Sequence, residues 1–116
     1  MSIDCKRGEI YLVNWNPARG SEQAGERPAL IIQNDIGNRF SPTTIIAACT
    51  TASARTYPFT VNVSAKESGL SRDSIINLAQ VITIDKTRLG AKCGKLSEKK
   101  MKEVDEAIKN SLGLIV

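Results

Sequence analysis

The sequence predicts a single mainly β domain of the α+β class, in which short antiparallel strands form a small barrel or sandwich and one amphipathic helix follows. The length of 116 residues suits one domain, so we treat residues 1–116 as a unit. Short runs of Ile, Val, Thr and aromatic residues recur between turn residues over the first 95 positions. With 41% hydrophobic and 24% charged residues, the composition is that of an ordinary globular protein.

Five segments are predicted to be strands because β-branched residues are concentrated between clusters of turn-forming residues. They are residues 9–15, 28–33, 44–50, 59–63 and 74–84, the last with a break near Gln80. Residues 34–42, NDIGNRFSP, have the composition of a turn. The connection over residues 16–26 is long for a hairpin, so it is either a flap over a substrate or a simple flexible connector.

Two of these strands are apolar on both faces, which is unusual in so small a domain. Residues 28–33 and 44–50 contain the runs ALII and TTIIAACT, without the alternation of a half-exposed strand. Such strands need something to cover each face, so the pattern predicts a homodimer in which a second subunit contributes to that cover.

The helix is expected over residues 97–112. Ser97 is a suitable N-cap, and an apolar stripe follows at helical spacing: Met101, Val104, Ile108 and Leu112. On the opposite face, acids and bases four residues apart form pairs of opposite sign. Charges balance over residues 1–85, so the net charge of +4 comes from residues 86–116. Most of this positive charge is explained if the charged face of the helix is exposed to solvent. The alternative interpretation is that these lysines contact nucleic acid directly.

The chain shows neither a signal peptide nor an apolar run long enough to span a membrane, so we expect no membrane association. Cys5, Cys49 and Cys93 form no C-x-x-C pair, which predicts three reduced thiols in the cytoplasm rather than disulfides or a zinc site. The sequence contains no histidine. This excludes a nuclease with a histidine pair and a Ser-His-Asp hydrolase.

Arg27 and Thr50 are the candidate catalytic residues. Pro28 favours an extended backbone at Arg27 and so fixes where the guanidinium leaves the chain. Thr50 ends the next apolar strand and would lie near Arg27 if the two strands pair as a hairpin. Taken alone, these two residues are weak evidence for catalysis, because surface arginines and strand threonines are common.

The segment from Gly20 to Thr51, GSEQAGERPALIIQNDIGNRFSPTTIIAACTT, resembles the MazF (PemK-like) family of toxin ribonucleases. KRGEIYLVNW before it and RDSIINLAQVITIDKTRL after it extend the resemblance from Lys6 into the final helix. The resemblance implies an SH3-like β barrel with a carboxy-terminal helix, and a homodimer whose groove binds single-stranded RNA. It also implies cleavage at short sequence motifs without a metal or other cofactor, and inhibition by a cognate MazE-like antitoxin.

The same resemblance assigns residue roles. Arg27 of GERP and Thr50 of AACT match the catalytic arginine and threonine of the family. Four residues match substrate-binding positions: Ser21, Glu22, Gln23 and Gln80. The chain departs from the E-Q-x-R-T pattern of closer family members, since Ala79 and Ile82 replace its acid and its arginine. We therefore expect the cleavage residues to be retained and the base preference to differ.

The implied reaction is attack by the 2′-hydroxyl of RNA on the adjacent phosphate, which gives a 2′,3′-cyclic phosphate and a 5′-hydroxyl. A guanidinium keeps its proton near neutral pH, so we expect Arg27 to stabilise the phosphorane and Thr50 to donate a hydrogen bond to it. An acidic antitoxin segment that folds on binding would suit the same groove. Two other functions stay open: a topoisomerase poison resembling CcdB, and a non-catalytic binding module.

Overall fold

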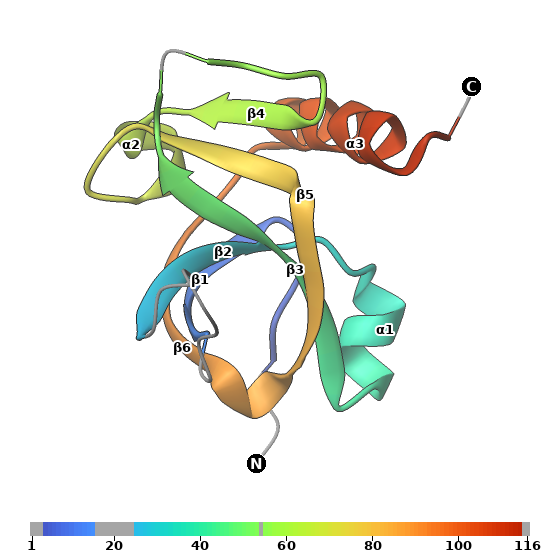
Figure 1. Cartoon of the computed structure of the whole chain (residues 1–116). Helices are drawn as coiled ribbons and strands as arrows, with labels where there is room; N and C mark the ends of the chain where they lie inside the picture. Colours follow the sequence, from blue (N-terminus) through green and yellow to red (C-terminus); the bar gives the residue numbers. More distant parts are fainter. Residues whose placement is uncertain (1–3, 16–24, 54, 115–116) are drawn as a thin grey trace.

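The computed structural model describes residues 4–15, 25–53 and 55–114 (Figure 1). The strands are β1 (Glu9–Asn14), β2 (Glu26–Ile31), β3 (Thr43–Thr51), β4 (Thr60–Val63), β5 (Ser74–Asp85) and β6 (Leu89–Lys95). The helices are α1 (Asp35–Phe40), α2 (Ala65–Ser68), the 3-10 turn η1 (Lys86–Arg88) and α3 (Glu98–Leu112). The mainly β fold with a carboxy-terminal helix is confirmed.

All six strands belong to one antiparallel sheet with the order β4-β5-β3-β2-β1-β6. The sheet curls strongly (Figure 1) but is not closed, because no ladder joins the described strands β4 and β6. The sixth strand, β6, was not predicted. Its sequence LGAKCGK has two glycines and little β-branched character, so pairing with β1 rather than intrinsic preference makes it a strand.

The central strands β2 and β3 bury both faces within the chain. On one face Leu30 and Ala47 join a core that α3 covers through Val104 and Ala107. A second core lies on the other face and contains eight buried residues: Cys5, Tyr11, Val13, Ala29, Ile31, Ile46, Ile84 and Leu89. The two-faced apolar pattern therefore does not by itself require a second subunit, contrary to our reasoning from the sequence.

The predicted break near Gln80 is a β-bulge. Ala47 of β3 pairs with Val81 of β5, whereas the next residue, Ala48, pairs with Asn77. The three residues of β5 between Asn77 and Val81 therefore have no partner on β3. Figure 1 shows β5 turning sharply along its length. Residues 79–83, which lie in the bulge and directly after it, are exposed.

The expectation of a turn over residues 34–42 was wrong in part, because this segment contains α1. Asn34 caps the helix by accepting a hydrogen bond from the Gly37 amide at 2.8 Å. Asn and Asp are frequent both in turns and at helix N-caps, so composition alone cannot separate the two.

The predicted terminal helix is confirmed as α3. The Ser97 side chain accepts a hydrogen bond from the Lys100 amide, and Gly113 ends the helix with φ of 71°. Val104 is buried, but Leu112, the last residue of the predicted stripe, is 65% exposed. The ion pairs within the helix have a spacing of three residues rather than four. No helix in the described ranges is long and apolar enough to cross a membrane.

Candidate functional site

A cleft of about 370 Å³ lies where β2 begins and β3 ends, facing the connection between α2 and β5. Its volume is within the range of small-ligand sites. The residues that line it are Leu12, Arg27, Pro28, Cys49, Thr50, Thr51, Gly69, Leu70, Ser71, Arg72, Ser74 and Cys93.

Arg27 and Thr50 both line this cleft, on neighbouring strands. The register of β2 against β3 pairs Ala29 with Ala48, and continuing it by two residues sets Arg27 opposite Thr50. Both residues are half-buried. The indole Nε1 of Trp15 donates a hydrogen bond to the Arg27 carbonyl at 3.3 Å, which holds the start of β2 against the end of β1. The hairpin expected from the sequence therefore brings the two candidate residues together.

The lining of the cleft has the chemistry of an anion site. It contains two arginines and four hydroxyl side chains, and none of the described residues that line it is an Asp or a Glu. Guanidinium and hydroxyl groups are donors that bind phosphate oxygens well. Glu26 precedes Arg27, but its carboxylate lies against Gly90 of β6, where a Cβ atom would overlap it. The arrangement can therefore bind a phosphate and stabilise added negative charge on it.

Two cysteines also line the cleft, but neither is suited to act as a nucleophile. Burial raises the pKa of the Cys49 thiol to about 12. Burial also raises the pKa of Cys93, which is only partly exposed. The thiolate is the nucleophilic form of cysteine, so both side chains stay protonated at neutral pH and serve as part of the wall.

The other predicted site residues do not line the described cleft. Gln80 is exposed in the bulge of β5, opposite the Ala47–Ala48 step of β3. Ala79 and Ile82, where the chain departs from the family pattern, are exposed on the same part of β5. Ser21, Glu22 and Gln23, and the flap expected around them, lie outside the described residues.

Comparison with known proteins identifies the family of the chain. The model of the family described as PemK-like, MazF-like toxin of type II toxin-antitoxin system matches residues 6–112. The chain belongs to this family. It is 51% identical to the endoribonuclease EndoA of Bacillus subtilis (strain 168) over 111 residues, which cover 95% of this chain and 96% of that protein.

Solved structures of family members have the same fold. An endoribonuclease in complex with its cognate antitoxin, from a mycobacterial species, superposes with a TM-score of 0.82 at 25% identity and covers 97% of this chain and 98% of its own. MazF from Deinococcus radiodurans superposes with a TM-score of 0.78 at 21% identity, over 97% of this chain and 99% of its own. The family resemblance drawn from the sequence is confirmed.

Arg72 is the charged residue of the cleft that sequence reasoning missed. It comes from the connection between α2 and β5, far from Arg27 along the chain, and nothing in the string GLSRD marks it as part of a site. The preceding S-x-x-E string, Ser64 to Glu67, is a capping-box signature that could have located α2.

Proposed function

We propose that this toxin is an endoribonuclease that cleaves single-stranded RNA in the cytoplasm and so stops translation and growth. The observation that carries the proposal is the placement of Arg27 opposite Thr50 in a cleft whose described lining has no carboxylate. Family membership and the 51% identity to EndoA support it.

The proposed reaction uses the substrate's own 2′-hydroxyl as the nucleophile. The 2′-oxygen forms a bond to the adjacent phosphorus, and the bond from phosphorus to the 5′-oxygen breaks. The 2′-hydroxyl loses its proton and the departing 5′-oxygen gains one, so the products are a 2′,3′-cyclic phosphate and a 5′-hydroxyl. DNA lacks the 2′-hydroxyl and would not be cleaved.

Arg27 and Thr50 would stabilise the phosphorane in this reaction. Arginine keeps its proton in proteins, so Arg27 acts through charge and through its fixed fork of donors rather than as a base. Thr50 donates a hydrogen bond to a non-bridging phosphate oxygen. Removing one such donor from a transition state lowers kcat by about 100- to 1,000-fold.

The decisive experiment is digestion of a long mixed-sequence RNA by the purified protein in EDTA, followed by mapping of product ends. We expect cleavage at a short recurrent motif, with cyclic phosphate and 5′-hydroxyl ends. Arg27→Lys should lose most single-turnover cleavage while remaining folded, because an ammonium cannot make the bidentate contact. If folded wild-type protein binds this RNA and never cuts it, the binding-module function replaces the proposal. Inhibition of a topoisomerase without any RNA cleavage would support the CcdB-like alternative.

We also propose that the active toxin is a homodimer, as the family resemblance implies. Ile36 and Phe40 of α1 are each 75% exposed, and Val81 and Ile82 of β5 are exposed as well. Large exposed side chains of this kind are frequent in subunit interfaces. Sedimentation equilibrium should give twice the chain mass for the wild type. Phe40→Glu should weaken this dimer, whereas Leu114→Glu, at another exposed apolar site, should leave it intact.

The partner proposed to inhibit the toxin is a MazE-like antitoxin with an acidic segment that enters the cleft. Carboxylates would bind the guanidiniums that otherwise bind phosphates, so antitoxin and RNA would exclude each other. A saturating acidic antitoxin peptide should displace a labelled, uncleavable RNA. Simultaneous binding of both would refute the shared site.

A further inference from the structure

We propose that Arg72 is a second phosphate-binding residue of the cleft, which holds the RNA chain beside the phosphate that reacts at Arg27. The inference rests on the proposed function and adds a residue that neither the family resemblance nor the sequence assigned. Arg27 lies at the start of β2, whereas Arg72 lies just before β5, on the wall of the cleft formed by Gly69, Leu70, Ser71, Arg72 and Ser74.

Within the described part of the chain, Arg72 is available for a ligand. It is exposed, and its carbonyl accepts a hydrogen bond from the Ser74 hydroxyl at 3.0 Å. The ion pairs that the described residues form involve Arg7, Lys92, Lys100 and Lys109, and none involves Arg72. The carboxylate of its neighbour Asp73 accepts a hydrogen bond from the Ala65 amide at 2.8 Å, so it is directed toward α2.

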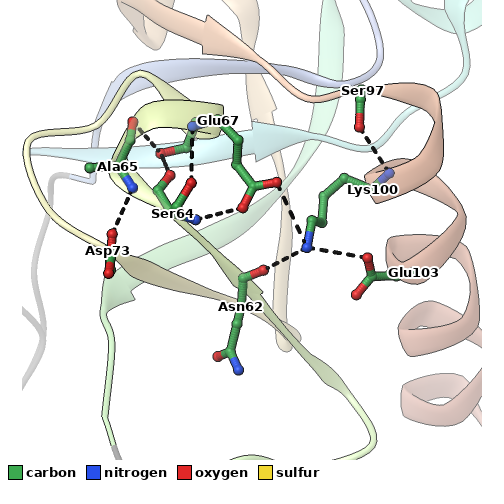
Figure 2. Close-up of polar contacts among 9 residues, drawn as sticks. Asn62, Ser64, Ala65, Glu67, Asp73, Ser97, Lys100 and Glu103 are labelled. Carbon is green, nitrogen blue, oxygen red and sulfur yellow. Dashed lines mark hydrogen bonds and ion pairs between the residues drawn. The ribbon is translucent and has the colours of Figure 1, made fainter.

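The wall that carries Arg72 is held by α2 (Figure 2). Ser64 and Glu67 form a capping box, with the Ser64 amide donating to Glu67 at 2.7 Å and the Glu67 amide donating to the Ser64 hydroxyl at 3.1 Å. The hydrogen bond from the Ser64 amide to the Glu67 carboxylate, together with the nearby Lys100 ammonium, holds the pKa of Glu67 below its usual value. The contact from Ala65 to Asp73 joins the start of α2 to the residue after Arg72, so residues 65–73 form a closed loop.

Lys100 anchors this loop to α3. Figure 2 shows its ammonium between α2, β4 and its own helix. The Nζ atom donates to the Asn62 carbonyl at 3.2 Å and lies 3.8 Å from Glu67 and 3.2 Å from Glu103. The Lys100 side chain is 19% exposed, so these contacts are partly shielded from water. Through Lys100, the terminal helix therefore supports the wall of the cleft.

On the other side, the end of α2 lies against β6 through two glycines. Gly69 has φ of 79°, and a Cβ atom there would collide with the Cys93 carbonyl oxygen. A Cβ atom on Gly94 would collide with the Ser68 carbonyl oxygen. Only glycine at both positions lets the two backbones approach this closely. Gly69 and Cys93 also line the cleft, so this contact sets its width on the side of Arg72.

Two guanidiniums that line one cleft from separate segments of the chain suit a polyanion. With Arg27 on the phosphate that reacts, Arg72 would bind a neighbouring phosphate whose charge does not change during the reaction. Such a contact favours the bound substrate and the transition state equally, so its loss raises KM and leaves kcat nearly unchanged. Loss of one phosphate contact also makes binding to single strands less dependent on salt, by about 0.7 in the logarithmic slope.

The experiment compares full-length wild type with Arg72→Gln on an RNA oligonucleotide that contains one mapped cleavage site. We expect KM to rise about tenfold at low salt, because a hydrogen bond between charged groups is lost, with kcat within about twofold of wild type. The dissociation constant for the same oligonucleotide with a 2′-deoxy group at the cleavage site should rise equally, with a salt slope lower by about 0.7. Arg72→Lys keeps the charge and should recover part of the affinity.

Lys102→Gln is the matched control, because Lys102 is an exposed cation on α3 that does not line the cleft. If Arg72→Gln changes KM and the salt slope no more than Lys102→Gln does, the proposal is refuted. A large fall in kcat with unchanged KM would also refute it, since Arg72 would then act in the transition state. Failure of wild-type protein to cleave any RNA would refute the proposed function instead, and the dissociation constants would still test Arg72.

Discussion

The contact between α2 and β6 predicts a large and specific effect of adding one methyl group. Gly69 and Gly113 both cap helices with positive φ, of 79° and 71°, but their surroundings differ. A Cβ atom on Gly69 would overlap the backbone of Cys93, whereas a Cβ atom on Gly113 would meet nothing within 4 Å. The two Gly→Ala substitutions therefore share the penalty of left-handed backbone, and only Gly69→Ala adds a collision.

The expected magnitudes follow from these two contributions. An alanine with left-handed φ costs about 1–2 kcal/mol, which is the whole effect expected for Gly113→Ala. Forcing an extra methyl group into a packed site costs about 1–3 kcal/mol more, so Gly69→Ala should lower the free energy of unfolding by about 2–5 kcal/mol. Gly94 does not have positive φ, so Gly94→Ala should cost about 1–3 kcal/mol.

Urea unfolding at pH 7 measures these differences in the free energy of unfolding. The variants can be compared directly if their m-values are equal. The double variant Gly69→Ala/Gly94→Ala should cost less than the sum of the two single variants, because either methyl group already separates the same two backbones. Gly94→Ala should also raise KM for RNA, since the wall that carries Arg72 moves, while Gly113→Ala should not. Equal destabilisation by Gly69→Ala and Gly113→Ala would refute the close contact.

Three further predictions concern other parts of the chain. Burial raises the pKa of Glu9, but hydrogen bonds from Lys92, from a backbone amide and from Tyr11 outweigh it and hold the pKa below its usual value. This stabilisation is present above the pKa of the unfolded state and is lost as pH falls below about 4. Glu9→Gln should therefore reduce the fall in the free energy of unfolding at acid pH, measured by urea unfolding, and an unchanged fall would contradict this. Ser97→Ala should lower the free energy of unfolding by about 1 kcal/mol in the same assay, and no change would mean that the cap is dispensable. In native protein, iodoacetamide followed by peptide mass spectrometry should modify Cys93 before the buried Cys49; the reverse order would contradict the burial of Cys49.

Much of the fold could be predicted because local pattern and tertiary environment agree in most elements. The apolar runs around Ile31 and Ile46 become central strands, and the stripe through Val104 becomes the buried face of α3. The agreement fails where one composition serves two structures, as at Asn34 before α1. It also fails where pairing alone makes a strand, as at Gly90 and Gly94 of β6.

Only part of the candidate site could be predicted from the sequence. Arg27 and Thr50 were accessible from the sequence because the family resemblance names them, and the antiparallel pairing of β2 and β3 then sets their positions opposite each other. Arg72 was not, because its position depends on α2 being tied to β6 and α3 by contacts distant in sequence. Such contacts leave no periodic pattern to detect.

Net charge is a poor guide to this cleft for a related reason. Charges balance over residues 1–85, yet the described lining of the cleft carries two arginines and no acid. The acids next to both arginines are directed elsewhere, since Asp73 accepts a hydrogen bond from the start of α2 and Glu26 lies against Gly90. Folding thus separates charges that cancel along the sequence, so a neutral body presents a positive site. The lysine-rich α3 contributes through Lys100, which holds the wall and does not line the cleft.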